Sequence, residues 1–478
     1  MKRVLCISII ALMSLVSSFD HLYAFNIPYI RFGEQKATEN TKPASDTAND
    51  MGDKVPQKPA VDLSDLSQPL TLKQCLGIAL DNAPNMKMAK ISIAQEDMNV
   101  QDAQASYLPD VGISGSYLFS KNIDFGWEKD NYASSLDASY VIWDHGQRRS
   151  TLEQSKARKD VELSRYRQTT QSLMFDVISG YYGLLEAEKL IAVDEQLLDI
   201  SKQNVEKIKA FIEKGWATEA DLATTRVQQA NDELTLINDQ NGLDISRANL
   251  ALTMGLDPDT QLKIIDDPDY ESYIKTGIIE TEQVSLEDMK SKSLVSRPEL
   301  VELNANQRIL ELAAKLAKLE RWPQITAETQ YNLDTASFLR ERNAIKNYTD
   351  WNVAARVTFP LFDGGRSKRT VQKAELALQN INESKYELEQ NITLEVRQAY
   401  LSFEQAKKSL DITAVQVEDA KMSLDVAQGR YDTLMDITLL ELLDAQTRYA
   451  RALTNRLQAF YNYKIARRSL EKAMGVLQ

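Results

Sequence analysis

Residues 177–212, VISGYYGLLEAEKLIAVDEQLLDISKQNVEKIKAFI, carry a large apolar residue at every seventh position. These positions hold Val177, Leu184, Ile191, Leu198, Val205 and Ile212. A seven-residue apolar repeat places one seam along a helix, and the seam lets that helix supercoil with its neighbours. The stretch therefore predicts a long coiled-coil helix.

A second stripe lies in the C-terminal half, and each member follows its counterpart in the first stripe by 219 positions. It consists of Val396, Phe403, Leu410, Val417, Leu424 and Tyr431. The positions three residues further on are mostly Gly, Ala or Ser, which let helices approach closely, but Asp194 interrupts the first of these small series. Residues 148–214 contain no proline, so this helix can run for on the order of 100 Å. A helix that long builds a rod, a tube or a tether.

The chain repeats itself from Leu70 onward, with offsets of 214 to 220 positions. The matching segments are 82–84 with 296–298, 107–109 with 321–323, 143–146 with 362–365, and 251–255 with 471–475. The small drift in offset indicates one duplicated supersecondary unit with loop-length differences. Each unit is predicted to contain a short helix, a medium helix, two strands, a very long helix and a long return helix.

The predicted organisation begins with a secretory signal peptide, because Lys2 and Arg3 precede a short apolar run followed by small residues. A polar segment that predicts a flexible tail follows it. The predicted boundaries are 1–24 for the signal peptide, 25–68 for the tail, 69–256 for the first repeat, 257–284 for an acidic, irregular equatorial linker, and 285–478 for the second repeat. The long hairpins are expected to turn near 214–218 and 434–438, with Gly215 as a helix stop and Thr218 and Thr438 as N-caps.

Four segments alternate apolar and polar residues, which predicts strands at about 110–120, 133–143, 324–333 and 350–360. Aromatic residues lie near the strand ends, with Tyr132 and Trp351 expected at one membrane interface and Trp143, Trp322 and Phe362 at the other. Residues 121–131 and 334–349 are expected to be polar loops. The pattern fits outer-membrane strands, although a half-buried sheet of a soluble protein alternates in the same way. Four strands cannot close a barrel in lipid, so the membrane interpretation requires several copies of the chain.

The composition argues against several classes of function. The net charge of −13 and the pI near 5.0 disfavour a nucleic-acid-binding protein. Once the signal peptide is removed, Cys75 and His145 are the single cysteine and the single histidine. Cys75 is expected to be a buried thiol and His145 a structural turn residue. We therefore predict no metal site, no cofactor and no enzymatic activity.

Taken together, these features resemble the TolC-type outer-membrane efflux and secretion channels. The resemblance covers nearly everything from Leu70 to Leu477, and its most specific parts are the duplication, the junction 360–366 (PLFDGGR) and the segment 442–446 (LLDAQ). It implies a mainly helical fold with an α-barrel tunnel, and a homotrimer whose protomers give four strands each to one 12-stranded β-barrel in outer-membrane lipid. It also implies a periplasmic adaptor (membrane fusion) protein and an inner-membrane pump or ABC transporter as partners.

The resemblance also suggests which residues surround the tunnel entrance. Glu441 and Asp444 match acidic residues that ring the entrance in the family, and the alternative is that they are solvated residues of the return helix. Asp221 resembles an acid that pairs with a basic residue of the second tip in some relatives. The segment 434–438 offers no Lys or Arg, so closure is expected to depend on apolar contacts.

The tip and gate residues predicted in this way are Asp221, Leu434, Met435, Asp436 and Ile437. Trp216 is predicted either to contact an adaptor or to pack between helices. The function favoured at this point is the exit duct of a tripartite efflux pump or of a type I secretion system. The alternative is a soluble periplasmic coiled-coil scaffold or adaptor.

Overall fold

The computed structural model describes residues 68–123, 127–276, 285–338, 346–434 and 437–477. These residues all belong to one unit of the chain, Ala60–Gln478. The predicted signal peptide and tail lie outside the described residues, apart from Gln68. Within the described part, no helix is both long enough and apolar enough to cross a bilayer.

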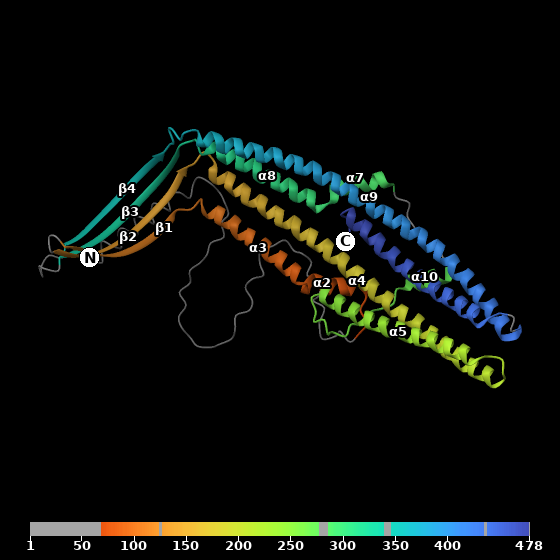
Figure 1. Ribbon diagram of the computed structural model, residues 1–478. Helices are drawn as coiled ribbons and strands as arrows, with labels where there is room; N and C mark the ends of the chain where they lie inside the picture. The colour runs from red at the N-terminus through yellow and green to blue at the C-terminus, as the bar shows by residue number, and fades with distance from the viewer. Residues whose placement is uncertain (1–67, 124–126, 277–284, 339–345, 435–436, 478) are drawn as a thin grey trace. The chain divides into compact units, whose positions relative to one another are not determined.

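The same order of elements occurs twice along the chain (Figure 1). The first unit consists of α2 (Leu72–Asn82), α3 (Pro84–Ala105), β1 (Asp110–Asn122), β2 (Trp127–Trp143), α4 (Gln147–Glu213) and α5 (Glu219–Thr253). The second unit consists of α7 (Leu286–Ser296), α8 (Pro298–Leu319), β3 (Gln324–Phe338), β4 (Lys346–Thr358), α9 (Arg366–Gly429), the π-helix η2 (Arg430–Leu434) and α10 (Leu439–Ala473). The predicted fold class, duplicated long helical hairpins with four strands, is confirmed.

The four strands form one antiparallel sheet in the order β1-β2-β3-β4. They are longer than predicted at the ends remote from the helices, so residues 121–131 and 334–349 are not simply loops. Paired residues such as Lys121 with Glu128 and Asn131 with Ala336 extend the ladder into these segments. The polar composition that suggested loops is compatible with strand, because polar side chains on an exposed strand remain solvated.

The two apolar stripes form the seams of α4 and α9, as predicted. In the first stripe Val177 and Leu184 are fully buried, and in the second stripe Val396 is. The hairpin partners α5 and α10 pack along α4 and α9, and α10 also packs against α4. The alanine series of α10 is largely buried at 445, 452, 459 and 473, which allows this close approach.

The linker between the units contains a helix that was not predicted, α6 (Pro268–Thr276). Tyr273 of α6 is buried, and its hydroxyl donates a hydrogen bond to the Leu410 carbonyl at 3.1 Å. Tyr270 stacks on Tyr461 with ring centroids 5.7 Å apart. These two aromatic residues lie three positions apart on one helical face and attach the linker to the core.

Two glycines fix the ends of the return helices against their own units. Gly255 after α5 has φ +75°, and a Cβ there would lie 2.7 Å from the Asn82 carbonyl oxygen. Gly475 after α10 has φ +72°, and a Cβ there would lie 3.0 Å from the Arg297 Cα. Both sites combine a left-handed backbone with a backbone-to-backbone contact, so only glycine fits without displacement.

Candidate functional site

Both return helices begin with the same capping arrangement. The Thr218 hydroxyl accepts from the Asp221 amide at 3.2 Å, and the Asp221 carboxylate accepts from the Thr218 amide at 2.8 Å. In the second unit Thr438 and Glu441 repeat this exchange at 3.3 and 3.1 Å. Each acid therefore satisfies an amide that the helix itself leaves unpaired. The hydrogen bonds from Thr218 lower the pKa of Asp221.

These contacts give two of the predicted entrance residues a local structural role. Glu441 is the closing acid of a capping box, which fixes its carboxylate at the start of α10. Asp444 forms an ion pair with Arg448 at 2.6 Å, and both side chains are mostly exposed. Neither contact requires or prevents an acidic ring, because the ring depends on how copies of the chain are arranged. The ring stays a prediction.

A groove of about 560 Å³ runs between the tip halves of α5 and α10. Val227 of α5 and Leu440 of α10 line it, and both are exposed. Asp444, Arg448 and Arg451 supply its charged wall. The groove therefore presents an apolar strip beside a mixed-charge strip.

The two hairpins are joined by a charged contact just before their tips. Lys207 of α4 forms an ion pair with Asp432 of η2, and the Phe211 ring lies 6.1 Å from the Tyr431 ring. Nearby, the Asn204 side-chain amide donates to the Gln446 side-chain oxygen at 2.9 Å. In this ion pair the first hairpin supplies the base and the second supplies the acid. The pair lies within one chain and does not test the expected apolar closure of the tips.

The residues predicted to form the gate are placed only in part. Leu434 ends η2, and Ile437 is half-buried. Met435 and Asp436 lie outside the described residues. A buried apolar cluster of Val205, Ile208, Leu222, Leu439 and Leu443 lies beside the tips and joins α4, α5 and α10. The apolar gate stays a prediction.

Trp216 lies in the first tip and is 58% exposed. The Lys214 ammonium group is 4.9 Å from its ring centroid, and the Phe211 ring centroid is 5.9 Å away. The Trp216 amide donates to the Phe211 carbonyl at 2.8 Å, which closes the end of α4 around Gly215. The indole is thus held in place while more than half of its surface is free for a partner.

Cross-strand partners project to the same side of a sheet. Because apolar and polar residues alternate along the strands, the sheet has one apolar and one polar face. One paired row consists of Ile113, Leu136, Tyr331 and Trp351, and the adjacent row consists of Gly112, Asp137, Gln330 and Asn352. Large residues of the apolar rows, such as Ile113 at 82% exposure, have no cover within the described chain. A sheet of this kind fits a boundary between lipid and water.

The predicted interfacial aromatic residues have specific contacts. Tyr132 packs on Tyr117 with ring centroids 4.9 Å apart, and the Trp351 indole donates to the Thr329 hydroxyl at 3.0 Å. Tyr132 pairs with Thr335 whereas Trp351 pairs with Tyr331, so the two rings are four paired rows apart. Their common membrane level therefore depends on strand tilt and stays a prediction.

The helix-proximal aromatic residues surround His145 in the first unit only. The Trp143 and Trp322 ring centroids each lie 4.2 Å from that of the imidazole, and His145 has φ 57°. Phe362, the counterpart of Trp143 in the second unit, is 92% exposed. The first junction is therefore covered by the second unit, while the second junction has no such cover from the residues that the structure describes.

Comparison with known proteins identifies one matching family model, described as "Outer membrane efflux protein", over residues 75–256 and 290–476. The chain is 22% identical to the outer membrane protein TolC of Vibrio cholerae over 393 residues, which covers 79% of this chain and 84% of that protein. It is 20% identical to TolC of Escherichia coli over 425 residues, covering 87% and 84%.

Solved structures share the fold. A crystal structure of CusC superimposes with a TM-score of 0.71 at 18% identity, covering 84% of this chain and 92% of that one. The Campylobacter jejuni CmeC outer membrane channel gives 0.70 at 17% identity, covering 85% of each chain. The open state of the Neisseria gonorrhoeae MtrE outer membrane channel gives 0.68 at 19% identity, covering 85% and 89%.

Proposed function

The chain belongs to the outer membrane efflux protein family, and we propose that three copies of it assemble into one duct. Membership of this family makes the chain an outer-membrane exit duct for efflux. The observation that carries the proposal is the four-stranded sheet, whose apolar face suits lipid and whose outer strands β1 and β4 each have one partner strand in the described chain. Unpaired strand edges are not tolerated in lipid, so β1 of one copy pairs with β4 of the next. Three copies then close one 12-stranded barrel.

The internal duplication supports this assembly. Some contacts join the two units within one chain, and the residues at the equivalent positions of the other unit do not make the same contact within the described chain. Trp322 packs against His145 next to Trp143. The counterpart of Trp322 is Leu108, which is 61% exposed, and the counterpart of Trp143 is the exposed Phe362. We infer that Leu108 of one copy covers Phe362 of its neighbour, as Trp322 covers the first junction within the chain.

A polar contact repeats this logic further along the helices. The Gln171 side-chain amide of α4 donates to the Gly475 carbonyl at 2.9 Å, which joins the two units. The counterparts of these residues are Gln390 and Gly255, with the same residue types. Gln390 is exposed on α9. In the assembly, Gln390 donates to the Gly255 carbonyl of the neighbouring copy.

The tips are proposed as the docking end for a periplasmic adaptor protein, with an inner-membrane pump or ABC transporter beyond it. Support comes from Trp216, a fixed but largely exposed aromatic residue of the kind that dominates protein interfaces. Glu441 and Asp444 are proposed to line the entrance as an acidic ring. The chain is assigned no catalytic step, and a soluble periplasmic scaffold is not favoured by membership of an outer-membrane family.

The assembly is tested with the full-length protein purified in detergent. We expect a mass of three chains by light scattering corrected for bound detergent, and discrete conductance steps in planar bilayers. A monomer that gives no conductance would contradict the proposal. A trimer without conductance would retain the assembly and remove the open duct.

A further inference from the structure

A buried carboxylate lies in the tip-side half of α4, at a position where the coiled-coil repeat otherwise places small residues. Asp194 is 5% exposed, and its Oδ2 atom has no hydrogen-bond partner among the described residues. The counterpart position in the second unit is Thr413, which is also buried but donates its hydroxyl to the Ser409 carbonyl at 2.8 Å. The second unit thus satisfies this position within its own helix, and the first unit does not.

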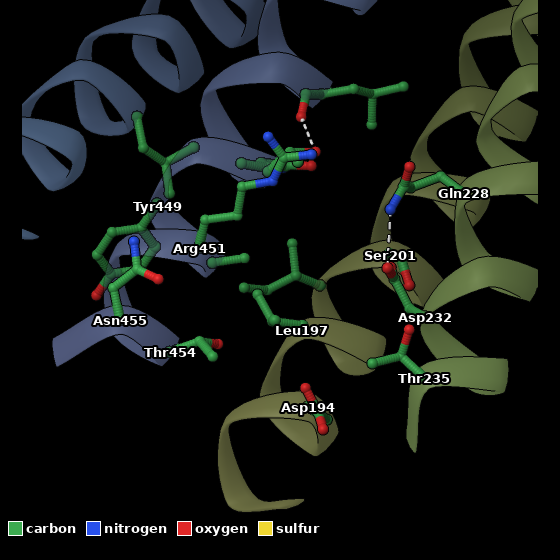
Figure 2. Close-up of a pocket in the computed structure, with 16 residues that line it drawn as sticks. Asp194, Leu197, Ser201, Gln228, Asp232, Thr235, Tyr449, Arg451, Thr454 and Asn455 are labelled. Carbon is green, nitrogen blue, oxygen red and sulfur yellow. Dashed lines mark hydrogen bonds between the residues drawn. The ribbon is translucent and has the colours of Figure 1, made fainter. Parts of the chain in front are cut away.

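Asp194 lines a cavity of about 260 Å³ between the hairpins. Figure 2 shows Asp194 and Ser201 with Asp232 on one side of the cavity and Tyr449 and Arg451 on the other. The walls come from α4, α5, α9 and α10. A cavity of this size admits several water molecules, so protons can reach the carboxylate.

The groups that face Asp194 include two further acids. Asp239 of α5 lies close enough to Asp194 for the two carboxyl groups to interact, and a hydrogen bond between two carboxyl groups needs a proton on one of them. Asp232 of α5 accepts from the Gln228 side-chain amide at 2.8 Å. Across the cavity, α10 contributes Arg451 and Tyr449, whereas α9 contributes the apolar Leu424. Burial, followed by the contact with Asp239, raises the pKa of Asp194 to about 7.

The chemistry of the cluster suits a proton better than a metal ion. In the part of the chain that the structure describes, no group of three or more acidic, His or Cys side chains could hold a metal ion. We propose that Asp194 is a proton-binding site that controls how tightly α4 packs against α5 and α10. With the proton in place, Asp194 can donate a hydrogen bond to the Asp239 carboxylate, which holds α4 against α5.

Loss of the proton reverses this effect. The carboxylates of Asp194, Asp239 and Asp232 then repel one another, and more water enters the cavity to hydrate them. Asp194 lies about 30 Å from the end of α4, at 1.5 Å per residue. A change in packing there alters the separation of the two hairpins at their tips. We expect the tunnel entrance to widen as the pH rises. This consequence rests on the proposed function, in which the tips surround the entrance.

The test uses the full-length trimer in detergent with spin labels at Val227→Cys and Leu440→Cys, on opposite walls of the groove between α5 and α10. Cys75 is fully buried and stays unlabelled. We expect longer interspin distances at pH 8.5 than at pH 5.5, with a midpoint near pH 7, and we expect Asp194→Asn to keep the short distances at both pH values. Asp199→Asn, on the exposed face of the same helix, is the matched control and should keep the shift.

Two results would overturn the inference: distances that do not change with pH in the parent, or a shift that persists in Asp194→Asn. Conductance of the same preparations separates this test from the proposed function. A conducting trimer with pH-independent distances removes only the proton site. A preparation without conductance that still shows the Asp194-dependent shift removes only the open duct.

Discussion

Lys207 of α4 and Asp432 of η2 form an ion pair that joins the two hairpins of one chain just before their tips. The Lys207 ammonium group also lies 5.6 Å from the ring centroid of Tyr431. Both charged side chains are more than a quarter exposed, so the pair contributes only about 0.2–1 kcal/mol. This free energy is small compared with the stability of a folded protein. It is enough to shift the equilibrium between two positions of the tips that have similar free energies.

The first prediction concerns this ion pair. Asp432→Asn should raise the open probability in planar bilayers by about 1.5-fold to 5-fold, the equivalent of the energy of an exposed pair. The charge exchange Lys207→Glu with Asp432→Lys should restore the parent value. Glu206→Gln is the control, because it removes a pair with Lys209 that lies within α4 alone. Equal open probabilities in parent and Asp432→Asn would remove the pair from the gate.

The second prediction concerns the glycine at the end of α5. Gly255→Ala should lower stability by at least about 2 kcal/mol, because it strains a left-handed backbone and forces Cβ against the Asn82 carbonyl. Gly242→Ala, inside α5, meets nothing within 4 Å and should raise stability by about 0.5–1 kcal/mol. Thermal unfolding of the detergent-solubilised protein measures both changes. If the two substitutions changed the unfolding temperature by similar amounts, the chain at Gly255 would have room for a Cβ beside the Asn82 carbonyl.

The third prediction tests the contact between neighbouring copies. The double variant Leu108→Cys with Phe362→Cys should form disulfide-linked trimers on mild oxidation, resolved by non-reducing electrophoresis. Each single variant should remain monomeric in the gel. The natural Cys75 should not interfere, because burial raises the pKa of its thiol to about 12 and keeps it unreactive. Absence of covalent trimers from a preparation that is trimeric in solution would place the interface elsewhere.

Much of the fold could be predicted from the sequence because the periodic patterns are local. The stripe through Val177 and Leu184 indicates a helix and its buried face, and the duplication predicts the order of elements twice over. The helix α6 escaped prediction because only nine residues form it, and its two aromatic residues were not recognised as an anchoring face. The strand ends were missed because polar residues on an exposed strand look like loop residues.

The candidate site could be predicted less well, since it depends on pairs that are distant in sequence. Lys207 and Asp432 are 225 positions apart, and no local pattern connects them. Asp194 was recognised as a break in the small series, but its neighbours on α5 become apparent only in the structure. The capping roles of Asp221 and Glu441 follow from their spacing of three from Thr218 and Thr438, a signal that the sequence does contain.

The fourth prediction concerns the acidic ring. Glu441→Gln with Asp444→Asn should weaken block of the channel by multivalent cations, because three copies would lose six carboxylates around a narrow entrance. Gln can still close the capping box, so the start of α10 should be preserved. Glu219→Gln, an acid in the first turn of α5, is the control and should leave the block unchanged. If current–voltage recordings showed the same block in the double variant, these residues would not face the entrance.

The fifth prediction follows from the raised pKa of Asp194, about 7 in the folded protein against 3.8 for an unperturbed carboxyl. The folded state keeps a proton that the unfolded state has lost, so stability falls as the pH rises from about 4 to 7. Three units of pKa correspond to at most about 4 kcal/mol per chain. Asp194→Asn has no ionisable group at this position, so its stability does not fall in this way. The difference in unfolding temperature between Asp194→Asn and the parent should grow as the pH rises to 7 and stay constant above pH 7. Asp199→Asn should show no such trend, and a difference for Asp194→Asn that did not change with pH would mean that Asp194 is ionised throughout.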